Sequence, residues 1–234
     1  MKQTNVLYFA YRGFPTGLLT KQRKILIMNE IVLPAIIEGL KDDKYPTPEE
    51  YSYWKARQNR TFYIDYDIDE TYSLIELSKI IIDMNIDEKD IPKKELKPIR
   101  LMIQSYGGDI EQANYFCDLI KSSRIPIITV GLGVCMSAGF LIFISGHKRY
   151  AFKHCQMLIH EGSAAFQGTA AEIEQAQKNY RKQLDEMKEY ILERTAISEA
   201  IFNKNKSKDW YLTPQELLDY KVIDKFITDI SVIL

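Results

Sequence analysis

The spacing of hydrophobic and polar residues changes several times along this 234-residue chain, and each change marks an expected element. Mixed apolar runs at 60–65 and 99–104 predict strands, whereas 69–83 and 110–122 have the spacing of amphipathic helices. Residues 125–131 are continuously apolar, as in a strand covered on both faces. Strand, helix and strand in this order predict right-handed crossovers and a parallel sheet of the α/β class.

A long helix is expected over 169–194, with Thr169 as its cap. Its apolar residues step by three and four and form one stripe: Ile173, Ala176, Tyr180, Leu184, Met187 and Ile191. The stripe either packs on the chain's own sheet or interlocks with another subunit, and the pattern favours neither. A short helix from Ser198, a capped helix from Thr213 and a strand at 222–227 complete the expected elements.

Residues 1–59 differ in texture from the rest of the chain. An apolar helical stretch at 25–40, interrupted by Pro34, precedes a polar run at 41–59 in which Pro46 and Pro48 indicate a turn or linker. We therefore expect an N-terminal arm at 1–59 and an α/β domain at 60–234.

Composition excludes several functions. With 31 basic and 32 acidic residues, the net charge of -1 leaves no electrostatic footprint for nucleic acid. Three cysteines without a C-x-x-C pair predict neither a disulfide framework nor a zinc site, and they suit a reducing cytoplasm. Glycine and serine interrupt the apolar window 125–145, so we expect no membrane span. No phosphate-binding loop occurs, and we expect neither a cofactor nor a metal.

Two segments are candidates for chemistry. Ser137 lies among small residues before an apolar helix, which is typical either of a tightly packed helix cap or of a nucleophile with room for a substrate. His160 follows a short apolar strand, where an imidazole can face a cleft, whereas His147 and His154 lie in polar turns. Cys135 is a rival nucleophile, but a cysteine in an apolar segment is usually a small buried hydrophobic residue.

The turn at 104–108 contains paired glycines, which permit positive φ and can aim backbone N–H groups outward as oxyanion donors. A carboxylate would also be needed to orient His160. Chemistry alone does not choose among the 32 acidic residues.

Five ordered motifs together carry a family resemblance. They are SYGGD at 105–109, VCMSAGFL at 134–141, MLIH at 157–160, FQGTAAEI at 166–173 and DWYLTPQELLDYKVID at 209–224. In this order they resemble the ClpP family, the proteolytic subunit of the Clp protease, over about 60–230. The resemblance implies a ClpP/crotonase-like superhelix of ββα units with a protruding handle helix, which is similar to the segment 169–194.

The resemblance also implies roles for individual residues. Ser137 matches the family's nucleophile, His160 its general base and Asp209 the carboxylate that orients the base. The oxyanion donors match the amides of Gly107 and Ala138. The substrate-binding positions, where the family adds a peptide as a β-strand, match Gly108, Ser163, Ala164, Ala165 and Phe166.

By the same resemblance we expect a cytoplasmic serine endopeptidase that takes peptides or unfolded proteins into stacked heptameric rings, with a Clp-type ATPase as partner. The alternatives are a catalytically silent ring subunit, a crotonase-like enzyme acting on acyl-CoA and a signal-peptide peptidase. A missing membrane helix argues against the last.

The chain departs from the family pattern at several points. Glu161-Gly162 follow His160 where the family has Gln-Pro, Tyr106 replaces a proline, and Lys208 replaces an arginine before Asp209. The arm at 1–59 exceeds the family's short axial N-terminus. We consider three roles for it: a propeptide, an altered gate, or a replacement for the surface on which the unfoldase docks.

Overall fold

The computed structural model describes residues 48–69 and 74–233. The chain divides into two units, Met1–Lys55 and Ala56–Leu234. The helix expected at 25–40 lies outside the described residues, and the functional division at residue 59 stays a prediction. None of the helices in the described ranges combines the length and the apolar character needed to cross a bilayer.

The first described element corrects the expectation of a linker. Helix α1 (Pro48–Asn59) occupies most of the polar run. Proline suits the first helical position, because a backbone N–H at that position has no acceptor within the helix. Of the two prolines that we read as a turn signal, Pro48 is thus the first residue of a helix, and Pro46 lies outside the described residues.

Within the described residues, seven strands form one sheet with the order β1-β2-β3-β4-β7, and β5 and β6 extend it from the second half of β3. The strands are β1 (Thr61–Ile64), β2 (Ile99–Ser105), β3 (Ile127–Met136), β4 (Lys148–Phe152), β5 (Gln156–Ile159), β6 (Trp210–Leu212) and β7 (Lys225–Ile227). All neighbouring pairs are parallel except β5 with β6. The predicted parallel α/β fold is therefore confirmed.

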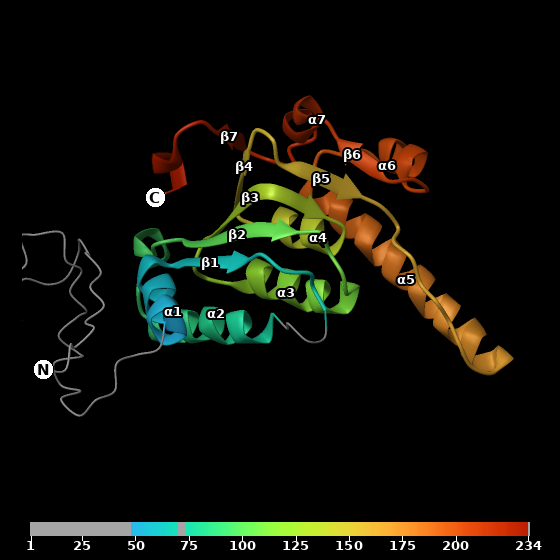
Figure 1. Ribbon diagram of the computed structural model, residues 1–234, viewed down its shortest axis with the longest axis horizontal. Coiled ribbons are helices and arrows are strands. Elements are labelled where there is room, and N and C mark those ends of the chain that lie inside the picture. The colour runs from blue at the N-terminus through green and yellow to red at the C-terminus, as the bar shows by residue number, and fades with distance from the viewer. Residues whose placement is uncertain (1–47, 70–73, 234) are drawn as a thin grey trace, which may run out of the picture. The chain divides into compact units, whose positions relative to one another are not determined.

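The helices follow the strands in the expected alternation (Figure 1). They are α2 (Ile75–Asp87), α3 (Ile110–Ser122), α4 (Ala138–Ile144), α5 (Ala170–Arg194), α6 (Glu199–Asn205) and α7 (Pro214–Asp219), with 3-10 turns η2 (Lys93–Glu95) and η3 (Ile230–Ile233). The expected bounds of α3 are confirmed. Helix α2 begins and ends later than the predicted 69–83, because apolar residues continue to Ile86 and acidic residues alone do not fix a helix start.

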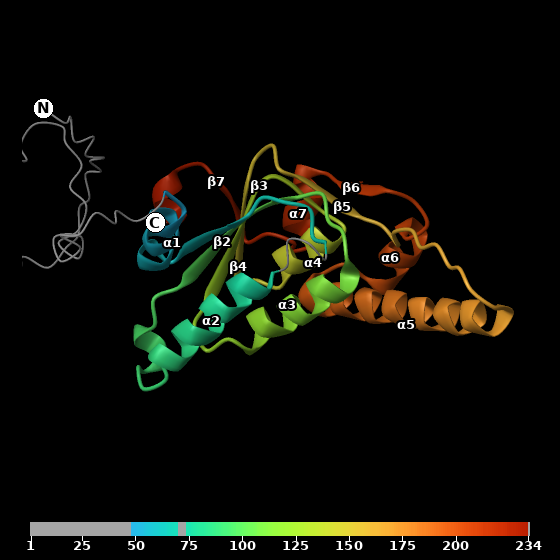
Figure 2. The same cartoon turned by 60° about the horizontal axis from the view of Figure 1, so that its bottom comes forward.

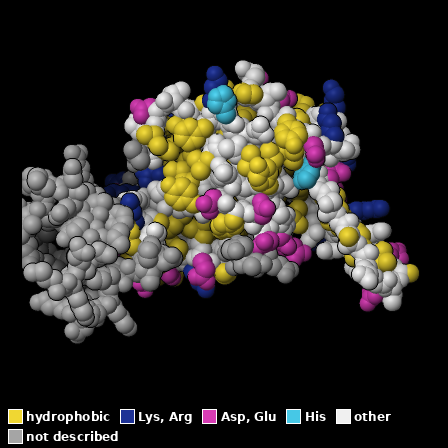
Figure 3. Space-filling view, viewed as in Figure 1, with side chains coloured by type: hydrophobic (Ala, Val, Ile, Leu, Met, Phe, Trp, Pro, Cys, Tyr) yellow, Lys and Arg dark blue, Asp and Glu magenta, His cyan; other side chains and the backbone are white. Residues whose placement is uncertain are grey.

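Both faces of the sheet are covered by apolar side chains. One face packs under α2, α3 and α4 in the main core, to which Leu101 and Ile127 contribute. On the other face a second cluster joins Met102 and Val130 to Ile233 in η3. Figure 3 shows hydrophobic side chains gathered over the sheet on the viewer's side. The continuous apolar run in β3 is explained by this double coverage.

Strand β3 is longer than predicted because it continues through two glycines that we treated as interruptions. A Cβ on Gly131 would lie 2.9 Å from the sulfur of Cys155, and one on Gly133 would lie 2.9 Å from the side-chain oxygen of Gln104. These glycines therefore permit close packing beside the strand. They allow β3 to extend to Met136, the residue before Ser137.

Helix α5 leaves the body of the domain and projects from it (Figure 2). Thr169 is the N-cap residue, as predicted, and it forms a full capping box with Glu172. Along the apolar stripe, Met187 and Ile191 are buried, whereas the earlier members are only half-buried. The C-terminal part of α5 thus packs on its own domain, and the N-terminal part extends beyond it.

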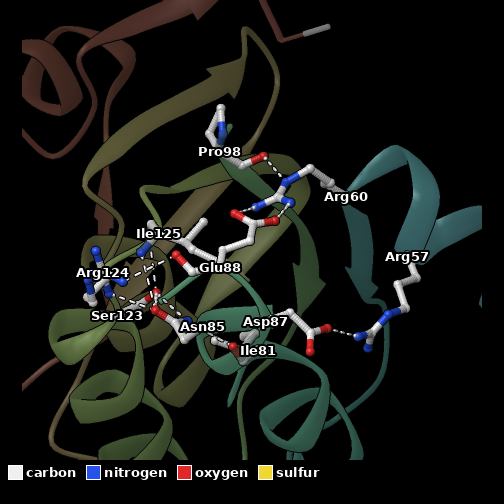
Figure 4. Close-up of polar contacts among 10 residues, drawn as sticks. All are labelled: Arg57, Arg60, Ile81, Asn85, Asp87, Glu88, Pro98, Ser123, Arg124 and Ile125. Atoms are coloured by element: carbon white, nitrogen blue, oxygen red, sulfur yellow. Dashed lines mark hydrogen bonds and ion pairs between the residues drawn. The ribbon is translucent and has the colours of Figure 1, made fainter. Parts of the chain in front are cut away.

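The end of α2 is tied to the beginning of the sheet by a polar network (Figure 4). The Asn85 carboxamide accepts hydrogen bonds from the backbone N–H groups of Arg124 and Ile125, at 2.8 and 3.3 Å. Arg60 donates to the Glu88 carboxylate and to the Pro98 carbonyl. These contacts fix the amino ends of β1, β2 and β3, opposite to the end at which Ser137 lies.

Candidate active site

Ser137 has a strained backbone at the junction of β3 and α4. Its φ of 54° and ψ of -124° are unusual for a residue with a Cβ, and such a conformation costs on the order of 1–3 kcal/mol. The Ser137 N–H donates to the Leu158 carbonyl of β5 at 3.0 Å. A serine on a sharp strand-to-helix turn is the arrangement that exposes a nucleophilic hydroxyl in many hydrolases.

The residues around Ser137 are small because larger side chains would clash with neighbouring atoms. A Cβ on Gly107 would lie 2.6 Å from the Ser137 Cβ and 3.1 Å from the Ala138 nitrogen, so the glycine turn abuts the serine. A Cβ on Gly139 would lie 3.1 Å from the Ser105 carbonyl oxygen. Glycine is thus needed on both sides of the contact between β2 and α4.

The paired glycines form the turn with positive φ that we expected, with φ of 108° at Gly107 and 136° at Gly108. Ile68 holds this turn in place. Its N–H donates to the Gly107 carbonyl at 2.7 Å, and its carbonyl accepts from the Asp109 N–H at 2.6 Å. Residues 107 and 109 thus bond to Ile68, and in such a parallel bridge the N–H and C=O of the residue between them point the other way.

One predicted oxyanion donor has another acceptor in this structure. The Gly107 N–H donates to the Ser105 hydroxyl at 3.2 Å. Gly108, whose own N–H lies on the side away from Ile68, is therefore the better-placed donor of the two glycines. Ala138 is the first residue of α4, where a backbone N–H has no acceptor within the helix.

His160 and Asp209 meet because of strand pairing. Strands β5 and β6 are antiparallel with Ile159 opposite Trp210, so the next residues along the pairing are His160 and Asp209. The Nδ1 atom of His160 lies 3.2 Å from Oδ1 of Asp209. The His160 side chain is 31% exposed and that of Asp209 63%. The chemistry of the residues did not single out this carboxylate, which was expected only from the family resemblance, and strand β6 was not predicted.

The serine and the histidine lie at the carboxyl ends of neighbouring strands. Met136 of β3 pairs with Leu158 of β5 in the parallel register. Ser137 follows Met136 directly, and His160 lies two residues after Leu158. Within residues 48–69 and 74–233, however, the Ser137 hydroxyl makes no hydrogen bond to His160. Catalytic hydrogen bonds are often long before substrate binds.

The rival nucleophile Cys135 is fully buried. Burial raises the pKa of its thiol, and the thiol of Cys155 close by raises it further. Its sulfur lies 4.0 Å from that of Cys155. Since a thiolate is the reactive form, this environment argues against Cys135 as a nucleophile.

The remaining histidines differ from His160 in their surroundings. The His147 Nδ1 accepts a hydrogen bond from the Ile127 N–H at 3.0 Å. Burial, together with the positive charge of Arg194, lowers the pKa of His147. His154 is exposed in the turn between β4 and β5. Neither lies at the end of the sheet that carries Ser137.

The segment between β5 and α5 contains most of the expected substrate contacts. Ser163, Ala164 and Ala165 are exposed, and Phe166 is half-buried against the ring of Tyr180. The resemblance assigns to these residues the pairing of a peptide as an added β-strand, and among the described elements the segment belongs to no strand. A strand requires a hydrogen-bonded neighbour, and the described part of the chain places none beside this segment.

Metal-binding side chains do not gather in the described ranges, which contain no group of three or more His, Cys, Asp and Glu residues suited to an ion.

Comparison with known proteins agrees with the fold. A family model described as Clp protease matches residues 58–229. The chain is 32% identical over 137 residues to the ATP-dependent Clp protease proteolytic subunit of Paracoccus denitrificans, covering 58% of this chain and 69% of that protein. It is 34% identical over 140 residues to the ATP-dependent Clp protease proteolytic subunit 2 of Bifidobacterium longum, covering 58% and 66%.

Proposed function

The chain belongs to the Clp protease family, and on this premise we propose that it is a serine endopeptidase with Ser137, His160 and Asp209 as its triad. The observation that carries the proposal is the pairing of His160 with Asp209 at 3.2 Å, on the strand that neighbours the strained Ser137. A strained serine next to a histidine–carboxylate pair suits acyl transfer.

In the proposed reaction the Ser137 hydroxyl attacks a peptide carbonyl while His160 Nε2 takes its proton. The same proton passes to the leaving amine when the C–N bond breaks, which leaves an acyl group on Ser137. Water then attacks the ester, His160 again accepts and returns a proton, and the acid is released. Asp209 holds the imidazole through Nδ1 and stabilises its charged form.

The oxyanion formed in each step needs two backbone donors. We assign this role to the Ala138 amide and to an amide of the glycine turn, and we favour Gly108 over the initially expected Gly107. The reason is that the Gly107 N–H is directed to Ser105. Loss of one oxyanion donor typically costs about 2.7–4 kcal/mol of barrier.

Peptide substrates would bind beside the segment 162–166. Its backbone makes no backbone hydrogen bond to any other described residue, which leaves N–H and C=O groups for an added strand. Ser163, Ala164 and Ala165 have small side chains, so an extended peptide could approach closely.

We further propose that the chain acts within an oligomer, with stacked heptameric rings as the expected form. The support is the projecting part of α5, whose apolar stripe is only half-buried at Ile173, Ala176 and Tyr180. The names of the relatives include dependence on ATP, and a Clp-type ATPase is the partner that we propose for this chain. Sedimentation should give a particle many times heavier than one chain; a stable monomer would refute this assembly.

A silent ring subunit is the second candidate. It is favoured by the missing hydrogen bond between Ser137 and His160 in the described structure, and by the exposure of Asp209. The two candidates differ in one assay. The assembled protein should cleave labelled casein, Ser137→Ala should not, and Cys135→Ala should retain the activity. Equal cleavage by the wild type and Ser137→Ala would refute the proposed peptidase, and no cleavage by either would favour the silent subunit.

A further inference from the structure

Helix α5 is connected to the segment that follows His160 by one side chain. The Tyr180 hydroxyl donates a hydrogen bond to the Glu161 carbonyl at 2.7 Å. Glu161 is the residue immediately after His160, and it stands where the resemblance led us to expect glutamine. The bond therefore fixes the orientation of the first peptide unit beyond His160.

The ring of Tyr180 holds the other end of the same segment. Its centroid lies 6.0 Å from that of Phe166, in an edge-to-face arrangement that adds to the stabilisation from burial. Between the two contacts, Gly162 has a φ of 74°. A Cβ there would meet only the Tyr180 hydroxyl, at 3.7 Å. The chain thus turns at Gly162 in open space, and Tyr180 fixes the residues on either side.

Glu161 has a second partner. Its carboxylate lies 3.6 Å from the Lys206 ammonium, in the stretch that leads to Asp209. Both side chains are partly exposed, so this ion pair contributes little stability on its own. The hydrogen bond from Tyr180 is the shorter contact, and it joins the backbone instead of a mobile side chain.

We propose that Tyr180 is a positioning residue that holds the segment 162–166 in place to pair with an extended peptide. The inference rests on the proposed function, because the segment matters only if a peptide binds there. Tyr180 does not touch the reacting atoms. It acts by fixing both ends of a segment whose backbone groups are left free for a substrate.

The surroundings of Tyr180 keep its hydroxyl protonated, as a hydrogen-bond donor must be. Burial, and secondarily the Glu161 carboxylate, raise the pKa of its hydroxyl. The hydroxyl therefore keeps its proton at neutral pH. Replacement of tyrosine by phenylalanine removes this hydrogen bond and leaves the aromatic contact with Phe166.

The same helix offers a matched control. The Tyr190 hydroxyl donates to the Ser145 hydroxyl at 2.8 Å, beyond the C-terminal end of α4. Tyr190→Phe therefore removes one hydroxyl from α5 without affecting the segment 162–166. A general loosening of α5 would affect both variants, whereas loss of substrate positioning would affect only Tyr180→Phe.

The test uses the full chain with Ser137→Ala, so that a bound peptide stays intact. The affinity of a fluorescein-labelled decapeptide is measured by anisotropy, alone and with each tyrosine variant. Tyr180→Phe should raise the Kd about three- to tenfold, as expected for one lost hydrogen bond. Tyr190→Phe should leave it within about twofold of the parent. If Tyr180→Phe does not fold, Phe166→Leu should raise the Kd in its place.

A second readout separates positioning from the chemical step. With Ser137 intact, a small fluorophosphonate that does not need the segment should label Tyr180→Phe at the wild-type rate. An unchanged peptide Kd in Tyr180→Phe, an equal loss in Tyr190→Phe, or no peptide binding by the parent would overturn the proposal. If the peptide Kd depends on Tyr180 while Ser137 is never labelled, the proposed peptidase function is refuted and the positioning role of Tyr180 stands.

Discussion

The Nδ1 atom of His160 lies 3.2 Å from the Oδ1 atom of Asp209, at the point where β5 and β6 begin to pair. The pair lies beside the strand that ends at Ser137, and no other histidine of the described residues has a carboxylate partner of this kind. The proposed peptidase depends on this relationship.

Asp209→Asn should lower kcat because an amide can stabilise the wrong tautomer of His160 and cannot stabilise its charged form. A loss of about 10²- to 10⁴-fold with little change in KM is expected. The neighbouring Lys208→Gln is the control, since it removes a charge but leaves the His160 contact. Steady-state hydrolysis of a quenched peptide measures both, and an unchanged kcat in Asp209→Asn would exclude an orienting role.

The backbone strain at Ser137 predicts an increase in stability when function is removed. Ser137→Gly should raise the free energy of unfolding by about 1 kcal/mol, because glycine adopts positive φ without the Cβ clash. The variant should therefore unfold at a higher denaturant concentration. Ser137→Ala keeps the Cβ and should gain almost nothing. Both should lack peptidase activity, and equal free energies of unfolding in the two variants would contradict the strain.

The contact between Gly107 and Ser137 predicts a severe effect of one methyl group. Gly107→Ala should destabilise the fold by about 3 kcal/mol or more, because its Cβ would lie 2.7 Å from the Met136 carbonyl oxygen. Gly162→Ala, also at positive φ but in open space, should cost only about 1 kcal/mol. Chemical denaturation of both variants gives the comparison, and similar losses would show that φ alone decides.

A third site of stability is the end of α4. Arg194 donates to the carbonyls of Ile144, Ser145 and Gly146 at 3.1, 3.1 and 2.9 Å. Arg194→Lys keeps the charge but loses the planar fork, and a loss of about 2 kcal/mol is expected. The exposed Arg181 on the same helix provides the control, since Arg181→Lys should be neutral in the same thermal or urea unfolding experiment.

The histidine at position 147 predicts a dependence of stability on pH. Its pKa is lowered in the folded state, so the unfolded chain binds a proton more readily as the pH falls below its ordinary value of about 6.5. Its contribution is thus complete above that pH and is lost on acidification. The side-chain oxygen of asparagine can also accept from the Ile127 N–H, so His147→Asn should keep the hydrogen bond but remove the titrating group. The urea midpoint of this variant should change less between pH 7.5 and 5 than that of the wild type. An equal change in both proteins would assign the pH dependence of stability to other groups.

Patterns and caps were sufficient to predict much of the fold. Asp109 accepts from the Gln112 N–H at the start of α3, and Thr169 and Thr213 each complete a capping box. Such local signals define helix starts because they satisfy backbone groups within a few residues. Where a start lacked a side-chain cap, as at α2, the prediction was displaced along the chain.

Contacts between distant segments could not be predicted in the same way. Strand β6 has only three residues, and its pairing with β5 is what brings Asp209 to His160. The motif at 209–224 indicated Asp209 through the family resemblance, but it did not indicate that Trp210–Leu212 pair with β5. The backbone bridge of Ile68 to Gly108 and the bond from the Tyr180 hydroxyl to the Glu161 carbonyl join residues far apart in sequence, which a single sequence does not pair.

Covalent labelling tests the central claim most directly. The assembled protein is treated with a fluorophosphonate probe, digested and analysed by mass spectrometry. We predict one adduct on Ser137, which Asp209→Asn slows and His160→Ala abolishes, while Cys135→Ala leaves it unchanged. An assembled protein without an adduct on Ser137, or with the adduct on another residue, would contradict the account.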